Sequence, residues 1–236
     1  MLDFLMIAYR NTKSGFEVYP KFIIKSSHKD LMIRGGDFYA IWDQERGLWS
    51  TDEGDAIRLI DAEIDKYVEE HKGFLGEGVK KLYMWDAGSG SIDFWHKYCQ
   101  KQMRDSYHML DEKLIFLNSG VNKKDYASKR LSYSLEPGSI EAWDKIVSTL
   151  YSEEERHKIE WCIGSIVTGE SKNIQKFAVL YGAAGTGKST ILNIIQMLFD
   201  GYYSVFDAKA LGSSSNSFAL EAFNSNPLVA IQHDGD

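Results

Sequence analysis

The chain has 236 residues, of which 44% are hydrophobic and 13% are aromatic, so it can bury a core in one or two domains. A formal net charge of −7 excludes a strongly basic wrapper of nucleic acid, although local clusters of cations can still attract DNA. No apolar run approaches the ~20 residues of a membrane span, and the first residues do not resemble a signal peptide. Cys99 and Cys162 are typical of reduced thiols. We therefore expect a cytoplasmic protein without membrane contact.

The first fifty residues are rich in short apolar runs that predict strands. Such runs occupy residues 22–24, 31–33 and 38–42, and turn residues separate them at 35–36 and 43–47. Their aromatic side chains fit the core of a small sheet, and they also fit a platform on which bases stack. The sheet core is the favoured interpretation, and the platform stays open.

A long helix is predicted next, capped by Ser50 or Thr51. The residues of its expected buried stripe recur at helical spacing: Ile57, Ile60, Ile64, Tyr67 and Val68. Acids in its first turn interact favourably with the helix dipole, so they need no catalytic role.

Two further elements are predicted before residue 110. Residues 80–85 indicate a strand, and residues 91–103 indicate a helix that turns Trp95 and Cys99 inward. His96 and Cys99 have no second ligand pair nearby, so a zinc site is not expected on this helix.

The most basic stretch of the chain follows a predicted strand at 113–118. Residues 123–133 interleave four cations with two tyrosines, namely Lys123, Lys124, Lys129 and Arg130 with Tyr126 and Tyr133. This pattern fits a groove that tracks a phosphate backbone, and it also fits a solvated loop whose tyrosines pack against the protein. The second interpretation is favoured.

A pair of helices is predicted between residues 139 and 169. Ser139 is expected to cap the first helix, and residues 152–155 form a capping box that opens the second. Gly169 ends the pair.

Residues 182–189 match the G-x-x-x-x-G-K-[ST] phosphate loop at every specified position. An apolar run at 176–181 predicts a buried parallel strand before the loop, and residues 189–200 predict a helix after it that Gly201 ends. Glycines let successive backbone N–H groups turn toward a phosphate, and the helix N-terminus adds its own unpaired N–H groups. The predicted nucleotide-binding residues are Gly182, Ala183, Ala184, Gly185, Thr186, Gly187, Lys188, Ser189 and Thr190.

Individual roles follow from the motif. Lys188 is expected to reach the β- and γ-phosphates of ATP, and the Ser189 hydroxyl is expected to bind Mg²⁺. An apolar run at 228–232, some 40 residues later, predicts a second buried strand that leads to two acids. Asp234, with Asp236 as the second choice, is the expected acid that holds Mg²⁺ or polarises the attacking water.

From about residue 110 to its end, the chain resembles the phage and plasmid primase–helicases of helicase superfamily III, which include the poxvirus-type nucleoside triphosphatase. The residues that carry the resemblance are Lys124-Asp125-Tyr126, Trp143, Ile159-Glu160-Trp161, Gly164, Gly169, Lys176-Phe177, the phosphate loop, Leu192-Asn193 and Pro227-Leu228-Val229-Ala230-Ile231. The resemblance implies an ATP-driven DNA helicase that acts as a homo-hexamer on single-stranded or forked DNA. Its magnesium-binding acid maps onto Asp234, although Gln232-His233 intervene after the strand.

We therefore expect an α/β protein with three parts. A small α+β region at 1–110 and a helical domain at 111–170 precede an AAA+-like P-loop NTPase core at 171–236. The core is expected to be incomplete, because no sensor asparagine, arginine finger or later strand follows the second motif. Nucleotide binding is then expected without efficient hydrolysis. The alternatives are a truncated subunit that binds DNA or a partner without hydrolysis, and a P-loop phosphotransferase of another class.

Overall fold

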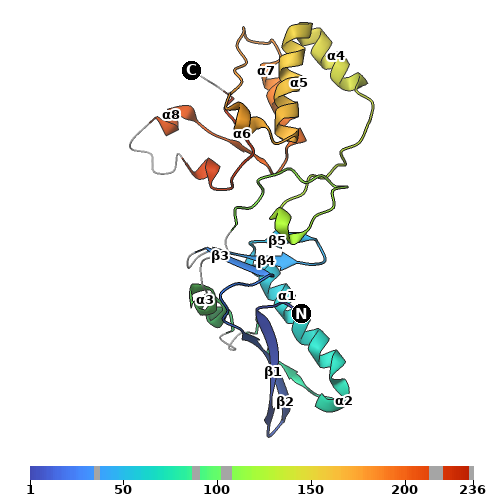
Figure 1. Cartoon of the computed structure of the whole chain (residues 1–236), viewed down its shortest axis with the longest axis vertical. Coiled ribbons are helices and arrows are strands. Elements are labelled where there is room, and N and C mark those ends of the chain that lie inside the picture. Colours follow the sequence, from blue (N-terminus) through green and yellow to red (C-terminus); the bar gives the residue numbers. More distant parts are fainter. Residues whose placement is uncertain (35–37, 87–90, 102–107, 213–219, 234–236) are drawn as a thin grey trace. The chain divides into compact units, whose positions relative to one another are not determined.

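The computed structural model describes residues 1–34, 38–86, 91–101, 108–212 and 220–233. The chain forms two compact units, of which unit 1 comprises Met1–Met109 with Val121–Ser128 and unit 2 comprises Leu110–Gly120 with Lys129–Asp236. Both units combine helices with small sheets, so the chain is a mixed α/β protein (Figure 1).

Unit 1 contains two three-stranded sheets. The first sheet has the order β1-β2-β6, with β1 and β2 antiparallel and β6 parallel to β2. The second sheet is an antiparallel meander with the order β3-β4-β5. The strands are β1 (Leu5–Thr12), β2 (Gly15–Phe22), β3 (Leu31–Arg34), β4 (Phe38–Asp43), β5 (Leu48–Ser50) and β6 (Lys80–Lys81). The helices are α1 (Glu53–Glu70), α2 (Lys72–Leu75), α3 (Ser91–Lys101) and the 3-10 helix η1 (Lys123–Asp125).

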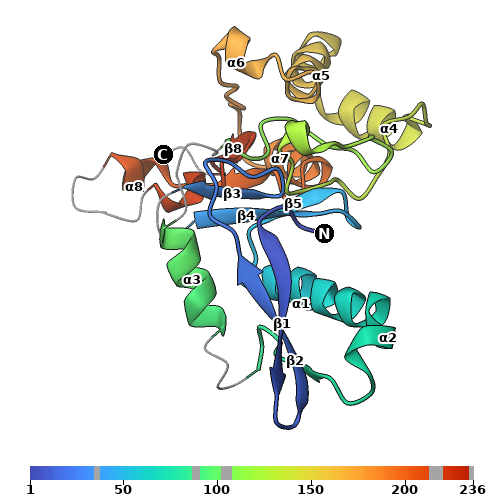
Figure 2. The ribbon, with the colours of Figure 1, turned by 60° about the horizontal axis from the view of Figure 1, so that its bottom comes forward.

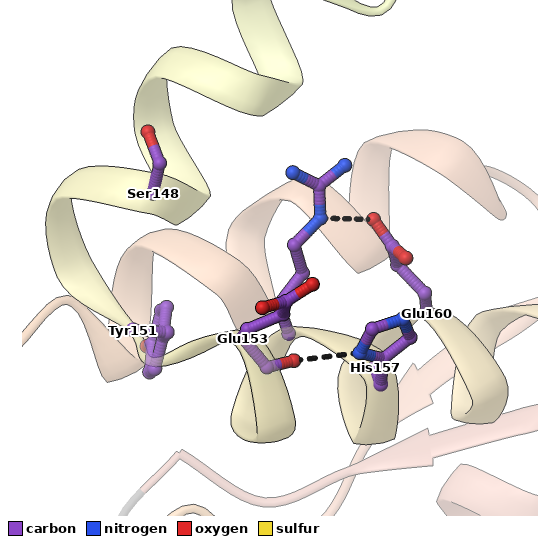
Figure 3. Close-up of a pocket in the computed structure, with 6 residues that line it drawn as sticks. Ser148, Tyr151, Glu153, His157 and Glu160 are labelled. Atoms are coloured by element: carbon purple, nitrogen blue, oxygen red, sulfur yellow. Dashed lines mark hydrogen bonds and ion pairs between the residues drawn. The ribbon is translucent and has the colours of Figure 1, made fainter.

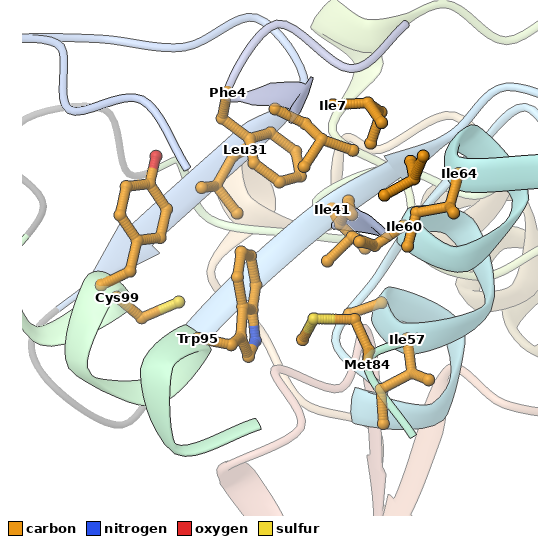
Figure 4. Packing of buried hydrophobic residues seen from close by; sticks show 14 of the residues in the cluster. Phe4, Ile7, Leu31, Ile41, Ile57, Ile60, Ile64, Met84, Trp95 and Cys99 are labelled. Atoms are coloured by element: carbon orange, nitrogen blue, oxygen red, sulfur yellow. The ribbon is translucent and has the colours of Figure 1, made fainter. Parts of the chain in front are cut away.

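The core of unit 1 lies where α1 contacts β1, β2 and β4 (Figure 2). Ile57, Ile60 and Ile64 of α1 are buried, as their spacing predicts, and Trp95 of α3 is fully buried in the same cluster (Figure 4). Burying one such side chain contributes about 1.5–3 kcal/mol. The apolar stripe of α1 therefore joins the helix to both sheets.

Polar side chains fix the ends of these elements. Asp52 is the N-cap of α1, and its carboxylate accepts a hydrogen bond from the N–H of Asp55, so the predicted caps at Ser50 and Thr51 were wrong. The Ser50 hydroxyl instead donates to the Asp55 carboxylate. Further along α1, Asp61 accepts the N–H of Met84 at 2.7 Å, and burial raises the pKa of the Asp61 carboxyl.

The predicted strands of unit 1 are confirmed in part. The runs at 31–33 and 38–42 lie in β3 and β4, and the turn at 43–47 forms around the buried carboxylate of Asp43. Only Phe22 of the run at 22–24 is in a strand, and only the first two residues of 80–85 are. The predicted turn at 35–36 lies outside the described residues, as does Met103 of the predicted helix at 91–103.

Unit 2 is mostly helical in its described part. Its helices are α4 (Glu141–Leu150), α5 (Glu153–Val167), α6 (Ser171–Ile174), α7 (Lys188–Leu198), α8 (Ala208–Leu211) and the 3-10 helix η2 (Glu221–Phe223). Strands β7 (Tyr203–Val205) and β8 (Val229–Ile231) form a two-stranded parallel sheet. The capping box that opens α5 is present as predicted, because Ser152 and Glu155 exchange hydrogen bonds with each other's backbone N–H groups.

Two apolar clusters hold unit 2 together. The first joins Phe199 and Tyr202, which follow α7, to Val229 and Ile231 of β8. The second consists of Val147 of α4, Ile159 of α5 and Ile191 of α7, so the pair of helices before the loop packs directly on the helix after it.

Two predicted strands of unit 2 are absent from its described residues. Residues 113–118 form an irregular segment in which Ile115 and Phe116 are buried. Its backbone pairs with a second segment through the hydrogen bonds from Leu131 N–H to Ile115 O and from Leu117 N–H to Tyr133 O, and the Asn118 side chain adds two more with the backbone of Leu135. Residues 176–181 are also irregular, and three of their side chains are 71–99% exposed, namely Phe177, Val179 and Tyr181. A strand needs a neighbour that pairs its backbone groups, and β7 and β8 pair with each other.

Candidate nucleotide-binding site

The loop at 182–189 has the backbone conformation that its glycines allow. Gly185 and Gly187 have φ angles of +79° and +80°, a left-handed region that residues with a Cβ atom rarely adopt. Gly187 is also the N-cap of α7, and in the part of the chain that the structure describes no side-chain hydrogen bond caps this end of the helix. The chain thus turns sharply into a helix whose N-terminus keeps the donors that a phosphate accepts.

Lys188 folds back over the loop that precedes it. Its Nζ atom donates hydrogen bonds to the carbonyl oxygens of Gly182 at 2.8 Å and Ala183 at 2.7 Å, and it lies 3.4 Å from Thr186 Oγ1. The Thr186 hydroxyl in turn donates to Ala183 O at 2.9 Å. Among the described residues, the partners of the ammonium group are therefore two carbonyl oxygens and a hydroxyl of the loop itself, and no carboxylate.

The rest of the predicted loop site is accessible. Ser189 and Thr190 are exposed on the first turn of α7, and Ala183 and Ala184 are exposed in the loop. The helix begins at Lys188, one residue before the predicted start, and ends at Leu198, ahead of Gly201. Ser189 is consequently in the first turn, where the motif expects a hydroxyl that binds a cation.

The predicted second half of the site consists of a strand and two acids, and the structure describes the strand but not the acids. Strand β8 forms within the predicted run 228–232, and both Val229 and Ile231 are buried. Beyond it, His233 Nε2 lies 3.1 Å from Gln196 Nε2, which connects the end of this segment to α7. Asp234 and Asp236 lie outside the described residues. Within the described part of the chain, no three His, Cys, Asp or Glu side chains gather closely enough to hold a metal ion.

The basic stretch at 123–133 is divided between the two units. In unit 1, Lys123 forms an ion pair with Asp30 and lies over the ring of Trp42, while the Tyr126 ring stacks on His108 with the centroids 4.0 Å apart. The Tyr126 contact agrees with the favoured interpretation, a solvated loop whose tyrosines pack against the protein, whereas the contacts of Lys123 were not predicted.

The part of the stretch in unit 2 is engaged in the same way. Lys129 Nζ lies 3.9 Å from an Asp111 carboxylate oxygen and over the ring of Tyr202, and the Tyr133 hydroxyl donates to Leu198 O at 2.5 Å. Two of the four cations therefore have acidic partners within their own unit.

A hollow of about 520 Å³ on α4 and α5 was not foreseen from the sequence (Figure 3). Arg156 crosses it and pairs with Asp144 at 2.5 Å and with Glu160 at 2.8 Å. A hydrogen bond from the Trp143 indole N–H and a smaller contribution from Arg156 lower the pKa of the Glu160 carboxyl. Because Arg156, Asp144 and Glu160 pair with one another, these charges form an ion-pair network with a structural role. The spacing of Arg156 and Glu160 at i and i+4 was the one signal for it in the sequence.

The thiols and His96 show no sign of a reactive site. Cys99 is buried, and burial raises the pKa of its thiol to about 12, whereas Cys162 is half-buried. His96 pairs with Glu53. Cys99 is therefore an inert residue of the core.

The chain matches no protein-family model, and no curated protein or solved structure matches it either. Across residues 1–34, 38–86, 91–101, 108–212 and 220–233, no helix combines the length and the apolar character needed to cross a membrane.

Proposed function

We propose that the chain binds ATP with Mg²⁺ through residues 182–189, as the nucleotide-binding part of an ATP-driven DNA helicase. The observation that carries the proposal is the position of Lys188. Its ammonium group is folded onto the loop carbonyls of Gly182 and Ala183, at the start of a helix that no side chain of the described residues caps.

The donor set of the loop fits a polyphosphate. Lys188 supplies a positive charge next to backbone N–H groups, and the loop atoms that it contacts now are weaker acceptors than a phosphate oxygen. A bound nucleotide would therefore draw the ammonium group from two neutral carbonyls to an anion. Ser189 and Asp234 are the proposed residues for Mg²⁺, which would neutralise charge on the phosphates when bound.

The helicase part of the proposal depends on the resemblance of residues 110–236 to superfamily III. It includes a P-loop NTPase core, assembly as a homo-hexamer and movement on single-stranded or forked DNA in the cytoplasm. The cluster of Val147, Ile159 and Ile191 supports a helical domain that works together with the motor, because it packs the two preceding helices on α7.

Equilibrium binding of a fluorescent ATP analogue with Mg²⁺ tests the nucleotide site. Lys188→Ala should weaken binding at least about tenfold, since a hydrogen bond to a charged group contributes about 1.5–3 kcal/mol. Lys176→Ala is the matched control, because Lys176 is an exposed lysine close to the loop in sequence and outside the motif. Equal affinity of the wild type and Lys188→Ala would reject the site, and equal losses in both variants would indicate unspecific attraction of the anion.

DNA binding and phosphate transfer decide between the wider alternatives. ATP-dependent oligomerisation on single-stranded DNA would favour the helicase, even without efficient hydrolysis. DNA binding that is insensitive to ATP and survives Lys188→Ala would favour a non-hydrolysing binding subunit. Transfer of phosphate to a small molecule, rather than to water, would favour a phosphotransferase.

A further inference from the structure

The last glycine of the loop touches a side chain from the preceding pair of helices. A Cβ atom built on Gly187 would lie 2.6 Å from Cδ1 of Leu150 and 3.2 Å from its Cδ2 and Cγ atoms. Leu150 is the last residue of α4, and Gly187 is the N-cap of α7. The leucine methyl groups therefore occupy the space directly beside the Gly187 backbone.

The other end of the loop packs on the apolar cluster that joins α4, α5 and α7. Leu180, two residues before Gly182, is partly buried against Val147 and Ile191 and their neighbours. By contrast, a Cβ atom on Gly185, in the middle of the loop, would meet nothing within 4 Å. The loop is thus held at both ends by apolar contacts and is open between them.

We infer that Leu150 is a positioning residue for the phosphate loop, through which the pair of helices α4 and α5 controls the affinity for nucleotide. This inference rests on the proposed function of the loop. Leu150 contacts the residue whose left-handed backbone turns the chain into α7. Without this side chain, Gly187 is free to change its backbone conformation. Such a change alters the direction of Lys188 and of the first N–H groups of the helix.

The coupling has a consequence for regulation. Because interfaces between packed side chains prefer discrete arrangements, a partner or a DNA strand that shifts the end of α4 would also shift Gly187. Couplings carried by packed side chains amount to about 0.5–2 kcal/mol, which corresponds to roughly 2- to 30-fold in affinity. Leu150→Ala should therefore weaken binding of the ATP analogue by roughly 2- to 30-fold.

The experiment uses the full chain and three variants. Leu150→Ala removes the contact, and Leu150→Met preserves an apolar side chain of similar volume and should restore it. Leu131→Ala removes buried volume from the other apolar cluster of unit 2, that of Phe199 and Tyr202. Hydrogen exchange of a peptide that covers residues 182–190 is measured in the nucleotide-free proteins, together with binding of the ATP analogue and urea unfolding.

The expected result is faster exchange of the loop peptide and weaker binding in Leu150→Ala, with both restored in Leu150→Met. Leu131→Ala should lower the free energy of unfolding but change the loop and the affinity less. Loop exchange in Leu150→Ala equal to that of the wild type overturns the inference, as does an equal effect of Leu131→Ala. If the wild type binds no nucleotide, the proposed function fails, while exchange of the loop still decides the role of Leu150.

Discussion

The contact between Leu150 and Gly187 predicts that two glycines of one loop tolerate alanine very differently. Gly185 and Gly187 have nearly the same φ, +79° and +80°, so an alanine meets a similar strain from a left-handed φ at both positions. That strain is about 1–2 kcal/mol. Only at Gly187 would the new methyl group meet a neighbour, with Leu150 Cδ1 at 2.6 Å. Overpacking of this kind adds about 1–3 kcal/mol.

Because the nearest atom is the end of a flexible leucine side chain, Gly187→Ala should lower the free energy of unfolding of unit 2 by about 1 kcal/mol more than Gly185→Ala does, at the lower end of that range. Urea unfolding, followed through hydrogen exchange of peptides from α7, reports on unit 2 separately from unit 1. In a double-mutant cycle, Leu150→Ala should recover this additional loss in Gly187→Ala and recover nothing in Gly185→Ala. Equal losses in the two single glycine variants would refute the described packing of α4 on the loop.

Three further predictions concern unit 1. Asp52→Ala should lower the free energy of unfolding by about 1 kcal/mol through loss of the N-cap of α1, whereas Thr51→Ala should change it little in the same urea titration. The hydrogen bond from Ser50 and the charges of Arg46 and Arg58 lower the pKa of Asp55. Its contribution to stability is therefore present above the unfolded pKa and is lost as the pH falls through the folded pKa, so Asp55→Asn should flatten the acid limb of a pH–stability profile. Because burial raises the pKa of the Cys99 thiol to about 12, this residue should react with a thiol reagent at pH 8 only after unfolding, in a labelling time course.

Short-range patterns in the sequence predicted those elements that depend on interactions between residues three or four positions apart. The stripe of Ile57, Ile60 and Ile64, and the capping box of Ser152 and Glu155, depend on spacings of three or four residues, and both occur in the structure. Strand β1 went unrecognised although its burial alternates at Leu5, Met6 and Ile7, which is the period of two that a half-buried strand shows.

The strand predicted at 176–181 shows the limit of such patterns. An apolar composition indicates only that a segment can be buried. A strand forms only where a neighbouring segment pairs with its backbone groups. Phe177 and Tyr181 are 89% and 99% exposed, because the parallel pair β7 and β8 forms without this segment.

The phosphate loop was recognisable because its residues are consecutive. The glycine spacing and Lys188 predicted a tight turn into a helix, and the left-handed Gly185 and Gly187 with α7 have that form. Leu150 could not be predicted as part of the site, because it lies 37 positions before Gly187 and its role depends on how α4 packs in space. Long-range contacts of this kind require the folded structure.

The most direct test of the central claim is hydrogen exchange of the wild-type chain with and without ATP and Mg²⁺, with Lys188→Ala measured alongside. If the loop binds nucleotide, ATP with Mg²⁺ should slow exchange in the peptide covering residues 182–190, and this protection should be lost in Lys188→Ala. Absence of protection there in the wild type, or equal protection in the variant, would contradict a nucleotide site in this loop.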